Sequence, residues 1–229
     1  MPTAAPYDEI ADWYESVFLA RQRAASAGEF ADTLGIDQAL VELLGAGAGR
    51  CLEVGCGTGI YADRIRQLGW TPVGIDLSTG MLRYARDRLP AVHGAARRLP
   101  FPDSSLDAAI SVMIHTDVPA YSPILTEVHR VLKPDGVFVH VGVHPCFCGG
   151  FADRTNPEQI VIRPGYRNGD WTTDSWTDQG IRDKVGAFHL SVADLVNGLL
   201  GAGFTLERLT EGGDPIPIVL SARLTKHTS

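Results

Sequence analysis

The chain has 229 residues, of which 45% are hydrophobic and 21% charged, a composition typical of a globular protein with a sizeable core. This length predicts one decorated domain or one domain with a small lid. The net charge of −7 argues against the basic face that binding along a nucleic-acid backbone requires. No apolar run approaches the roughly 20 residues that cross a bilayer, and the acidic amino-terminal stretch has no signal core. We therefore expect a cytoplasmic protein without nucleic-acid or membrane partners.

The four cysteines show no disulfide framework. Cys146 and Cys148 are separated by a single residue and have no second ligand pair, so no metal site is expected. We interpret both as packing residues.

The first predicted elements are helices. Apolar residues recur at spacings of three and four between residues 7 and 30, which predicts a helix. A second short helix is expected over 37–44, where the glycine-rich run GAGAG closes it. Together, residues 1–48 are predicted to form an N-terminal helical cap.

From residue 50 onward, short apolar runs alternate with amphipathic stretches, which predicts βαβ units and a mainly parallel sheet. Ser78 is the expected N-cap of a helix that runs to Leu89. The predicted strands are 50–54, 71–76, 91–95, 106–113 and 136–143, and the other predicted helices are 60–68 and 124–132.

Residues 144–188 break this rhythm, because they are rich in Gly, Asp, Pro and Trp and show little periodicity. Such a long irregular segment is typical of a lid or a binding loop, and its aromatic residues favour an ordered lid. A helix over 191–200 and two strands at 204–210 and 216–224 follow. We expect the two strands to form a hairpin at the edge of the sheet.

The sharpest local signal is the run LEVGCGTG at residues 52–59, which lies between a predicted strand and a helix. Glycines let the backbone turn tightly and approach a ligand, and the start of the helix presents unpaired amides. Asp76 ends the next strand, 23 residues after Glu53, where nucleotide-binding α/β folds carry a ribose-binding carboxylate. The alternative is a tight turn without a ligand.

This run resembles the first motif of the class I S-adenosylmethionine-dependent methyltransferases. RLPFPDSSLD at 98–107 resembles the run before the fourth strand of that family, and HRVLKPDGVFV at 129–139 resembles its helix-to-strand turn. HLSVADLVNGLLGAGF at 189–204 is similar to the family's late helix. The branch that the chain resembles acts on small molecules and includes enzymes of ubiquinone and menaquinone biosynthesis (the type 11 branch).

The resemblance implies an α/β fold with a Rossmann-like, seven-stranded, mostly parallel sheet, helices on both faces and an antiparallel last strand. This agrees with the predicted hairpin. The whole chain, 1–229, would then be one methyltransferase domain. Its parts would be the helical cap (1–48), the cofactor-binding core (49–143), the lid (144–188) and a C-terminal helix and hairpin (189–229).

The resemblance also implies a cofactor, S-adenosylmethionine, with S-adenosylhomocysteine as the product. Asp76 would accept hydrogen bonds from the ribose hydroxyls, Leu77 and Met81 would flank the adenine, and Tyr14 would close over the cofactor. The residues expected to face the methionine part are Glu53, Gly55, Cys56, Gly57, Thr58, Gly59, Val112 and Met113.

The loop after residue 93 departs from the family pattern. Many relatives carry an acid that meets the adenine amine where this chain has Ala95. The backbone of Ala96 is expected to take over that contact. Arg97 is either a cofactor-edge contact or part of a solvated face.

Methyl transfer from a sulfonium is an in-line displacement, in which the protein mainly positions and desolvates the reactants. A base is needed where the nucleophile must lose a proton. His115 and His144 directly follow the fourth and fifth long strands, and His189 follows the lid. We predict His144 or His189 as the general base, His115 as a cofactor-edge residue and Asp117 as a weaker candidate. The alternative for each histidine is a structural or surface role.

The acceptor side is the least patterned part of the sequence. Aromatic residues of the cap and the lid either wall the acceptor pocket or form the lid's own small core. These candidates are Tyr7, Phe147, Phe151, Trp171 and Trp176.

The leading hypothesis is a methyltransferase, monomeric or homodimeric, that acts on an O or N atom of a small-molecule acceptor. One alternative is an enzyme that methylates RNA or protein, although no basic patch or appended binding domain supports it. Another is a protein that binds the cofactor without methylating, such as a cyclase, since a fold does not fix a function.

Overall fold

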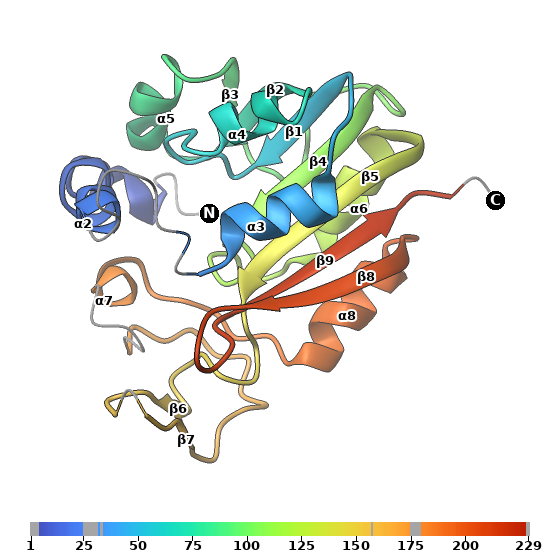
Figure 1. Ribbon diagram of the computed structural model, residues 1–229. Coiled ribbons are helices and arrows are strands. Elements are labelled where there is room, and N and C mark those ends of the chain that lie inside the picture. The colour runs from blue at the N-terminus through green and yellow to red at the C-terminus, as the bar shows by residue number, and fades with distance from the viewer. Residues whose placement is uncertain (1–4, 25–31, 33, 157, 175–179, 228–229) are drawn as a thin grey trace.

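The computed structural model describes residues 5–24, 32, 34–156, 158–174 and 180–227. Its centre is a seven-stranded sheet with the strand order β3-β2-β1-β4-β5-β9-β8 (Figure 1). The strands are β1 (Arg50–Val54), β2 (Thr71–Asp76), β3 (Ala91–His93), β4 (Leu106–Val112), β5 (Leu132–Val143), β8 (Thr205–Gly212) and β9 (Val219–Thr225).

The first five of these strands are parallel, and β9 pairs antiparallel with both β5 and β8. This confirms the predicted mostly parallel sheet with a reversed last strand and an edge hairpin. From β1 the chain builds outward through β2 and β3 on one side and through β4 and β5 on the other. Ligands of open α/β sheets bind beyond the carboxyl ends of the strands at such a reversal, so the sheet directs attention to the ends of β1, β2 and β4.

Helices cover both faces of the sheet (Figure 1). One core packs α3 and the π-helical turn that extends it against β4 and β5, and the other packs α6 and α8 against the opposite face. The helices are α3 (Ile36–Ala39, extended by a π-helical turn over Leu40–Leu44), α4 (Ala62–Gln67), α5 (Thr79–Ala85), α6 (Ser122–Val131) and α8 (Val192–Gly201).

The predicted boundaries hold best where a side chain or a buried run fixes them. The strands at 50–54 and 71–76 are observed as predicted, and the Ser78 hydroxyl caps α5 by accepting a hydrogen bond from the Met81 amide (3.0 Å). The helix nevertheless ends at Ala85, earlier than predicted, because the chain tightens into a turn in which the Arg88 amide bonds to the Ala85 carbonyl (2.8 Å).

The N-terminal cap is not the single helix that we predicted. It is divided into a 3-10 helical turn over Pro6–Asp8, α1 (Ala11–Trp13), a π-helical turn over Tyr14–Phe18 and α2 (Leu19–Ala24). The division begins at Ile10, whose backbone (φ −113, ψ 3) is not helical. Residues 25–30 of the predicted helix lie outside the described residues.

The lid carries short elements that the sequence did not predict: β6 (Ala152–Asp153), β7 (Val161–Ile162) and α7 (Ile181–Val185). Cys148 is a free, buried thiol that packs against Val143 and Ala187, as expected of a packing residue. In Figure 1 α7 and the N-terminal helices lie on the same side of the sheet, near the ends of the central strands. Cap and lid therefore meet over the edge where the ligand of such a sheet is expected.

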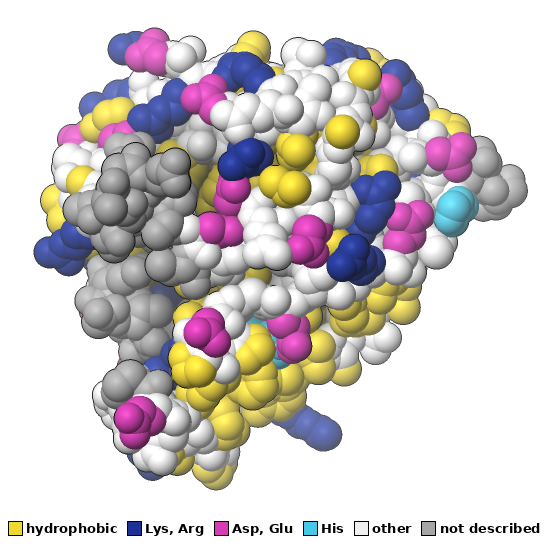
Figure 2. Space-filling model, viewed as in Figure 1, with side chains coloured by type: hydrophobic (Ala, Val, Ile, Leu, Met, Phe, Trp, Pro, Cys, Tyr) yellow, Lys and Arg dark blue, Asp and Glu magenta, His cyan; other side chains and the backbone are white. Residues whose placement is uncertain are grey.

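The viewed surface has acidic and basic side chains intermingled, with hydrophobic side chains gathered over the lower part, where Figure 1 places the lid (Figure 2). Exposed apolar side chains of the lid include Val161, Ile162 and Trp171. No helix in the described ranges is both long and apolar enough to cross a membrane.

Candidate functional site

The glycine run after β1 forms a turn that leaves room beside its backbone. Gly55, Gly57 and Gly59 have φ values of +67, +52 and +75, which other residues rarely adopt. A Cβ on Gly57 would meet nothing within 4 Å, whereas one on Gly55 would lie 2.4 Å from Cγ2 of Ile114. The turn is thus packed at Gly55 and open at Gly57, as a backbone that cradles a ligand must be.

Glu53 lies within β1 and is almost entirely buried, with 1% of its surface exposed. Its Oε2 atom has no hydrogen-bond partner among the described residues, and neither has the buried hydroxyl of Thr58. Burial, and then the nearby Asp76 carboxylate, raise the pKa of Glu53 to about 8. An orphaned carboxylate oxygen in such a place is costly unless a ligand donor reaches it.

Asp76 ends β2 and faces the glycine turn. Its Oδ2 accepts a hydrogen bond from the Gly57 amide (2.7 Å), and its Oδ1 accepts one from the Ser78 amide (2.8 Å). Burial raises the pKa of Asp76, and the charge of Asp117 raises it further, while the two amides oppose the shift. The carboxylate is thereby fixed in orientation and keeps lone pairs for a ligand.

The expected adenine contacts differ in their surroundings. Leu77 is 52% exposed beside Asp76, and its carbonyl is 3.0 Å from Nε2 of His93, so its apolar side chain is available to a planar ligand. Met81 is buried within α5 at 2% exposure. Ala96 is half-buried and Arg97 exposed in the loop after β3.

The end of β4 approaches the same turn. Val112 is buried, and Met113 has a positive φ of 62, a strained conformation for a residue with a side chain. Ile114 follows and packs against Gly55. The strained step therefore directs the chain after β4 toward the glycine turn.

The N-terminal cap places two tyrosines at this site. The Tyr7 hydroxyl donates a hydrogen bond to Oδ2 of Asp117 (3.1 Å), and the Tyr7 and Tyr14 rings meet edge to face at 6.2 Å. Burial raises the pKa of both phenols, and Asp117 raises both further. The cap therefore reaches Asp117, in the loop after β4, through Tyr7.

A row of acidic side chains, which sequence reasoning missed, fixes the cap to α5. Asp8 accepts hydrogen bonds from the Ser78 hydroxyl (2.7 Å) and the Gly80 amide (2.8 Å). Asp12 pairs with Arg83 at 2.8 Å, and further along Glu15 pairs with Arg88 at 2.5 Å. The spacing of these acids on a helix and the basic residues of 83–88 were the available signals.

Arg182 of α7 ties the lid to the loop after β4. Its guanidinium pairs with Oδ1 of Asp117 and donates a hydrogen bond to the Thr116 hydroxyl (3.0 Å). Asp117 therefore joins the cap, through Tyr7, to the lid, through Arg182. Sequence reasoning had rated Asp117 only as a weak base candidate and had not singled out Arg182.

His144 lies at the end of β5, where both of its ring nitrogens have partners. Nε2 is 2.7 Å from Oε1 of Glu211 in β8, and Nδ1 accepts a hydrogen bond from the Cys146 amide (3.1 Å). The Phe147 ring packs against it, with a centroid distance of 4.6 Å. This arrangement holds the start of the lid on the hairpin.

His189 lies within an aromatic cluster of the lid. Its ring is 4.8 Å from that of Phe151 and 5.3 Å from that of Tyr166, measured between centroids. Burial lowers the pKa of His189, and its Nε2 has no partner in the described part of the chain. The structure thus brings Phe151 and His189 together in a small lid core.

Trp171 lies at the lid surface, 43% exposed and packed against Phe188 at a centroid distance of 4.7 Å. Trp176, also an expected substrate residue, lies outside the described residues.

His115 lies just beyond β4 and is 2% exposed, and its Nδ1 has no partner within the described ranges. Burial lowers its pKa well below the usual value, and Arg182 lowers it further. The imidazole is therefore neutral at pH 7 and lies among groups of β5 and the lid.

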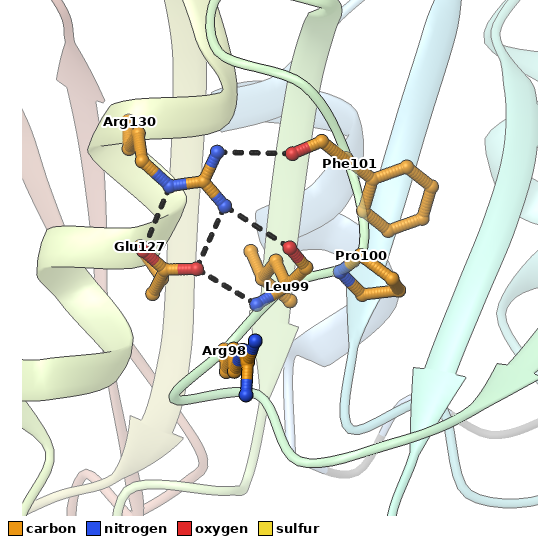
Figure 3. A pocket seen from close by; sticks show the side chains of 6 residues that line it. All are labelled: Arg98, Leu99, Pro100, Phe101, Glu127 and Arg130. Carbon is orange, nitrogen blue, oxygen red and sulfur yellow. Dashed lines mark hydrogen bonds and ion pairs between the residues drawn. The ribbon is translucent and has the colours of Figure 1, made fainter.

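Two of the other family-like runs, 98–107 and 129–139, meet each other in space (Figure 3). Glu127 of α6 accepts a hydrogen bond from the Leu99 amide (2.8 Å), and Arg130 donates to the carbonyls of Leu99 (3.0 Å) and Phe101 (2.9 Å). With Arg98 and Pro100 these residues line a surface pocket. The helix thereby fixes the loop that leads from Ala96 and Arg97 to β4.

Residues 52–140 match the model of a methyltransferase domain family. A fatty-acid O-methyltransferase of Mycolicibacterium smegmatis is 38% identical over 42% of this chain and 38% of its own length. A probable S-adenosylmethionine-dependent methyltransferase of the same species is 35% identical over 70% of this chain and 54% of its own. A malonyl-[acyl-carrier protein] O-methyltransferase of Serratia marcescens is 34% identical over 55% and 51%. The chain thus spans between 38% and 54% of these relatives.

Solved structures share the fold. An S-adenosylmethionine-dependent methyltransferase of Mesorhizobium loti superposes with a TM-score of 0.70 at 22% identity, over 85% of this chain and 98% of the other. The [4+2]-cyclase SpnF superposes with a TM-score of 0.66 at 18% identity, over 100% and 99%. The domain match, the sequence relatives and the shared fold agree: residues 52–140 are similar to a methyltransferase domain family, and the chain has the fold of the S-adenosylmethionine-dependent methyltransferases.

Proposed function

We propose that this chain binds S-adenosylmethionine and transfers its methyl group to an oxygen or nitrogen atom of a small molecule. The observation that carries the proposal is the pair of acids beside the glycine turn. Glu53 keeps a buried oxygen without a partner in the described structure, and Asp76 is held in place by two backbone amides.

The residues present fit this cofactor. S-adenosylmethionine offers an ammonium group and ribose hydroxyls, which are hydrogen-bond donors, and it carries a positive sulfonium. Glu53 would take the ammonium group, Asp76 the ribose hydroxyls and the exposed side chain of Leu77 one face of the adenine. The open side of Gly57 lets the cofactor approach the backbone.

The cover over this site favours a small acceptor over a macromolecule. Tyr7 and Arg182 reach Asp117 from the cap and from the lid, so both segments close over the ends of the strands. A covered site excludes water and strengthens the attraction between its charges. The names of two relatives, a fatty-acid O-methyltransferase and a malonyl-[acyl-carrier protein] O-methyltransferase, support an oxygen acceptor.

The bound cofactor supplies an activated methyl group on its sulfonium. As the acceptor atom bonds to the methyl carbon, the carbon–sulfur bond breaks with its electrons on sulfur, and a hydroxyl acceptor must pass its proton to a base. His115 suits this task, because it lies just beyond the end of β4, is buried and is neutral. We rank it above His144, whose two nitrogens have partners, and above His189 in the lid core.

The test is to incubate the protein with methyl-labelled S-adenosylmethionine and a fractionated small-molecule extract, and to measure S-adenosylhomocysteine and labelled product. We expect both to form in equal amounts, and more slowly with Asp76→Asn at the same cofactor concentration. Tight binding of the cofactor without transfer to any fraction would overturn the proposal. It would favour the cofactor-binding, non-methylating alternative, for which the fold shared with the cyclase is a precedent.

A further inference from the structure

A row of buried polar side chains runs beneath the ends of β4 and β5. Ser111 and His140 are neighbours in register on the two strands. The Tyr121 hydroxyl, at the start of α6, lies 2.9 Å from Oγ of Ser111 and 3.0 Å from Nδ1 of His140. Each of the three residues is at most 3% exposed, so their hydrogen bonds fix one another in a site that water does not reach.

This row of polar side chains ends at His115. The rings of His140 and His115 meet edge to face with centroids 5.2 Å apart. Nε2 of His140 and Nδ1 of His115 are both buried and lack a partner in the described structure. Both also face Gly142, two residues beyond His140 on the same side of β5. A Cβ there would lie 2.4 Å from Nδ1 of His115 and 2.7 Å from Nε2 of His140.

We propose that His140 is a positioning residue for His115. Held through Nδ1 by Tyr121 and Ser111, it presents the lone pair of Nε2 to an Nδ1–H of His115 and leaves Nε2 of His115 free to take the acceptor's proton. Gly142 is required because a side chain there would separate the two rings. This inference rests on the proposed function, since only a base at His115 selects this direction of hydrogen-bond donation along the row. Donation in the opposite direction would place hydrogens on both Nε2 atoms.

The charged and titratable groups around His115 come from every neighbouring element. They are His140 of β5, Tyr121 at the start of α6, Arg182 of α7 and His189 before α8. Arg182 opposes a positive charge on His115. Burial lowers the pKa of His140 to about 4, so His140 is neutral at pH 7. As an acceptor for Nδ1–H it favours the protonated form of His115. Removal of His140 therefore makes His115 harder to protonate, whereas a packing role alone predicts no such change.

The direct test is nitrogen NMR of the protein with labelled histidine, which reports the tautomer of each imidazole without cofactor or acceptor. We expect His115 and His140 both to carry their hydrogen on Nδ1. We expect Tyr121→Phe to mix the tautomers at both rings, because it removes only the hydroxyl that holds His140. A hydrogen on Nε2 of His115 in the wild type, or tautomers that Tyr121→Phe leaves unchanged, would overturn the proposal.

A second arm uses the pH dependence of methyl transfer. In His140→Gln we expect kcat to fall about tenfold, a typical share for a proton-transfer step, and its acidic limb to move to lower pH. His129→Gln, on α6 against Phe204, is the matched control and should leave the limb in place. A fall in kcat without a shift of the acidic limb of the pH profile would show that His140 has only a packing role. If no transfer occurs at all, the proposed function fails, while the tautomers still decide the arrangement of the histidines.

Discussion

Glu53 is a carboxyl group placed where a core residue would normally stand. Its burial raises its pKa to about 8, so the side chain holds its proton at neutral pH until a positive group arrives. The Glu53 carboxylate gains a full charge partner when the ligand binds. While the site is empty, burial of the neutral side chain costs little stability. The residue is therefore suited to recognising a ligand rather than to holding the sheet together.

The first prediction concerns Glu53→Gln and pH. The folded-state pKa of Glu53 lies above the ordinary value of 4.5, so the native protein keeps a proton that the unfolded chain releases between about pH 4.5 and 8. The free energy of unfolding must fall as pH rises through that window, and Gln avoids this loss. We expect urea unfolding to show the variant near wild type at pH 4.5 and on the order of 3 kcal/mol more stable at pH 9. An equal difference at both pH values would contradict the shift.

The second prediction concerns Asp76→Asn. Losing charged hydrogen bonds to the ribose hydroxyls should weaken the binding of S-adenosylhomocysteine about 10- to 100-fold, as measured by titration calorimetry. The free energy of unfolding should change little, because Asn can still accept from the Gly57 or Ser78 amide. Asp87→Asn, at an exposed residue of the turn after α5, is the control and should bind normally. Unchanged binding in Asp76→Asn would place the cofactor elsewhere.

At the scale of single residues, the sequence predicts contacts between residues that lie close together along the chain. The glycine turn, Glu53 and Asp76 follow from one motif and one spacing, so the structure brings them together as expected. His144 was a reasonable base candidate by position alone. Its partner Glu211 lies 67 residues further on, in a strand whose pairing the sequence does not reveal.

Among the elements, the cap and α5 are joined by charge. Arg88 donates to Glu15 of the cap and also to the carbonyl of Thr58 in the glycine turn (2.8 Å). The Arg88 guanidinium thus links the position of the cap to the shape of the glycine turn.

The third prediction follows from this link. Arg88→Ala should weaken the binding of S-adenosylhomocysteine about 3- to 10-fold, because a partly buried ion pair and a carbonyl contact are lost together. Arg86→Ala removes an exposed arginine whose nearest acid is 3.9 Å away and should leave affinity unchanged. Equal affinity for all three proteins would show that the cap is not coupled to the turn.

The lid depends on Asp117. In Asp117→Asn the buried guanidinium of Arg182 would lose its charge partner, and breaking a buried pair costs about 3 to 5 kcal/mol. We expect faster amide hydrogen exchange across α7 and around Tyr7, measured by mass spectrometry. Asp183→Asn, on the exposed face of α7, should exchange like wild type. Faster exchange in α7 alone would mean that Asp117 does not couple the cap to the lid.

The bounds of the helices and strands show which features sequence periodicity predicts and which it does not. The strands at 50–54 and 71–76 were predicted because buried parallel strands are continuous apolar runs. The cap was predicted as one helix because its apolar spacing continues through it. Its breaks follow from how Asp8 and Tyr7 dock on α5 and Asp117, which are distant in sequence.

For the whole molecule, a seven-stranded, mostly parallel sheet with a reversed last strand is predicted from alternating strands and helices together with the family resemblance, and the structure shows it. The closure of the cap and the lid over one edge was expected only in outline. Tyr7, Asp117 and Arg182, which make that closure, carry no local motif, so their meeting depends on the tertiary fold. We therefore expect the cofactor to lie between the ends of β1 and β2 and this double cover.

The most direct test of that claim is a crystal structure with S-adenosylhomocysteine bound. We predict the ribose hydroxyls on Asp76, the ammonium group on Oε2 of Glu53 and the sulfur facing the His115 side of the site. A ligand bound elsewhere, such as in the pocket beside Glu127 and Arg130 (Figure 3), with Glu53 still without a partner, would contradict it.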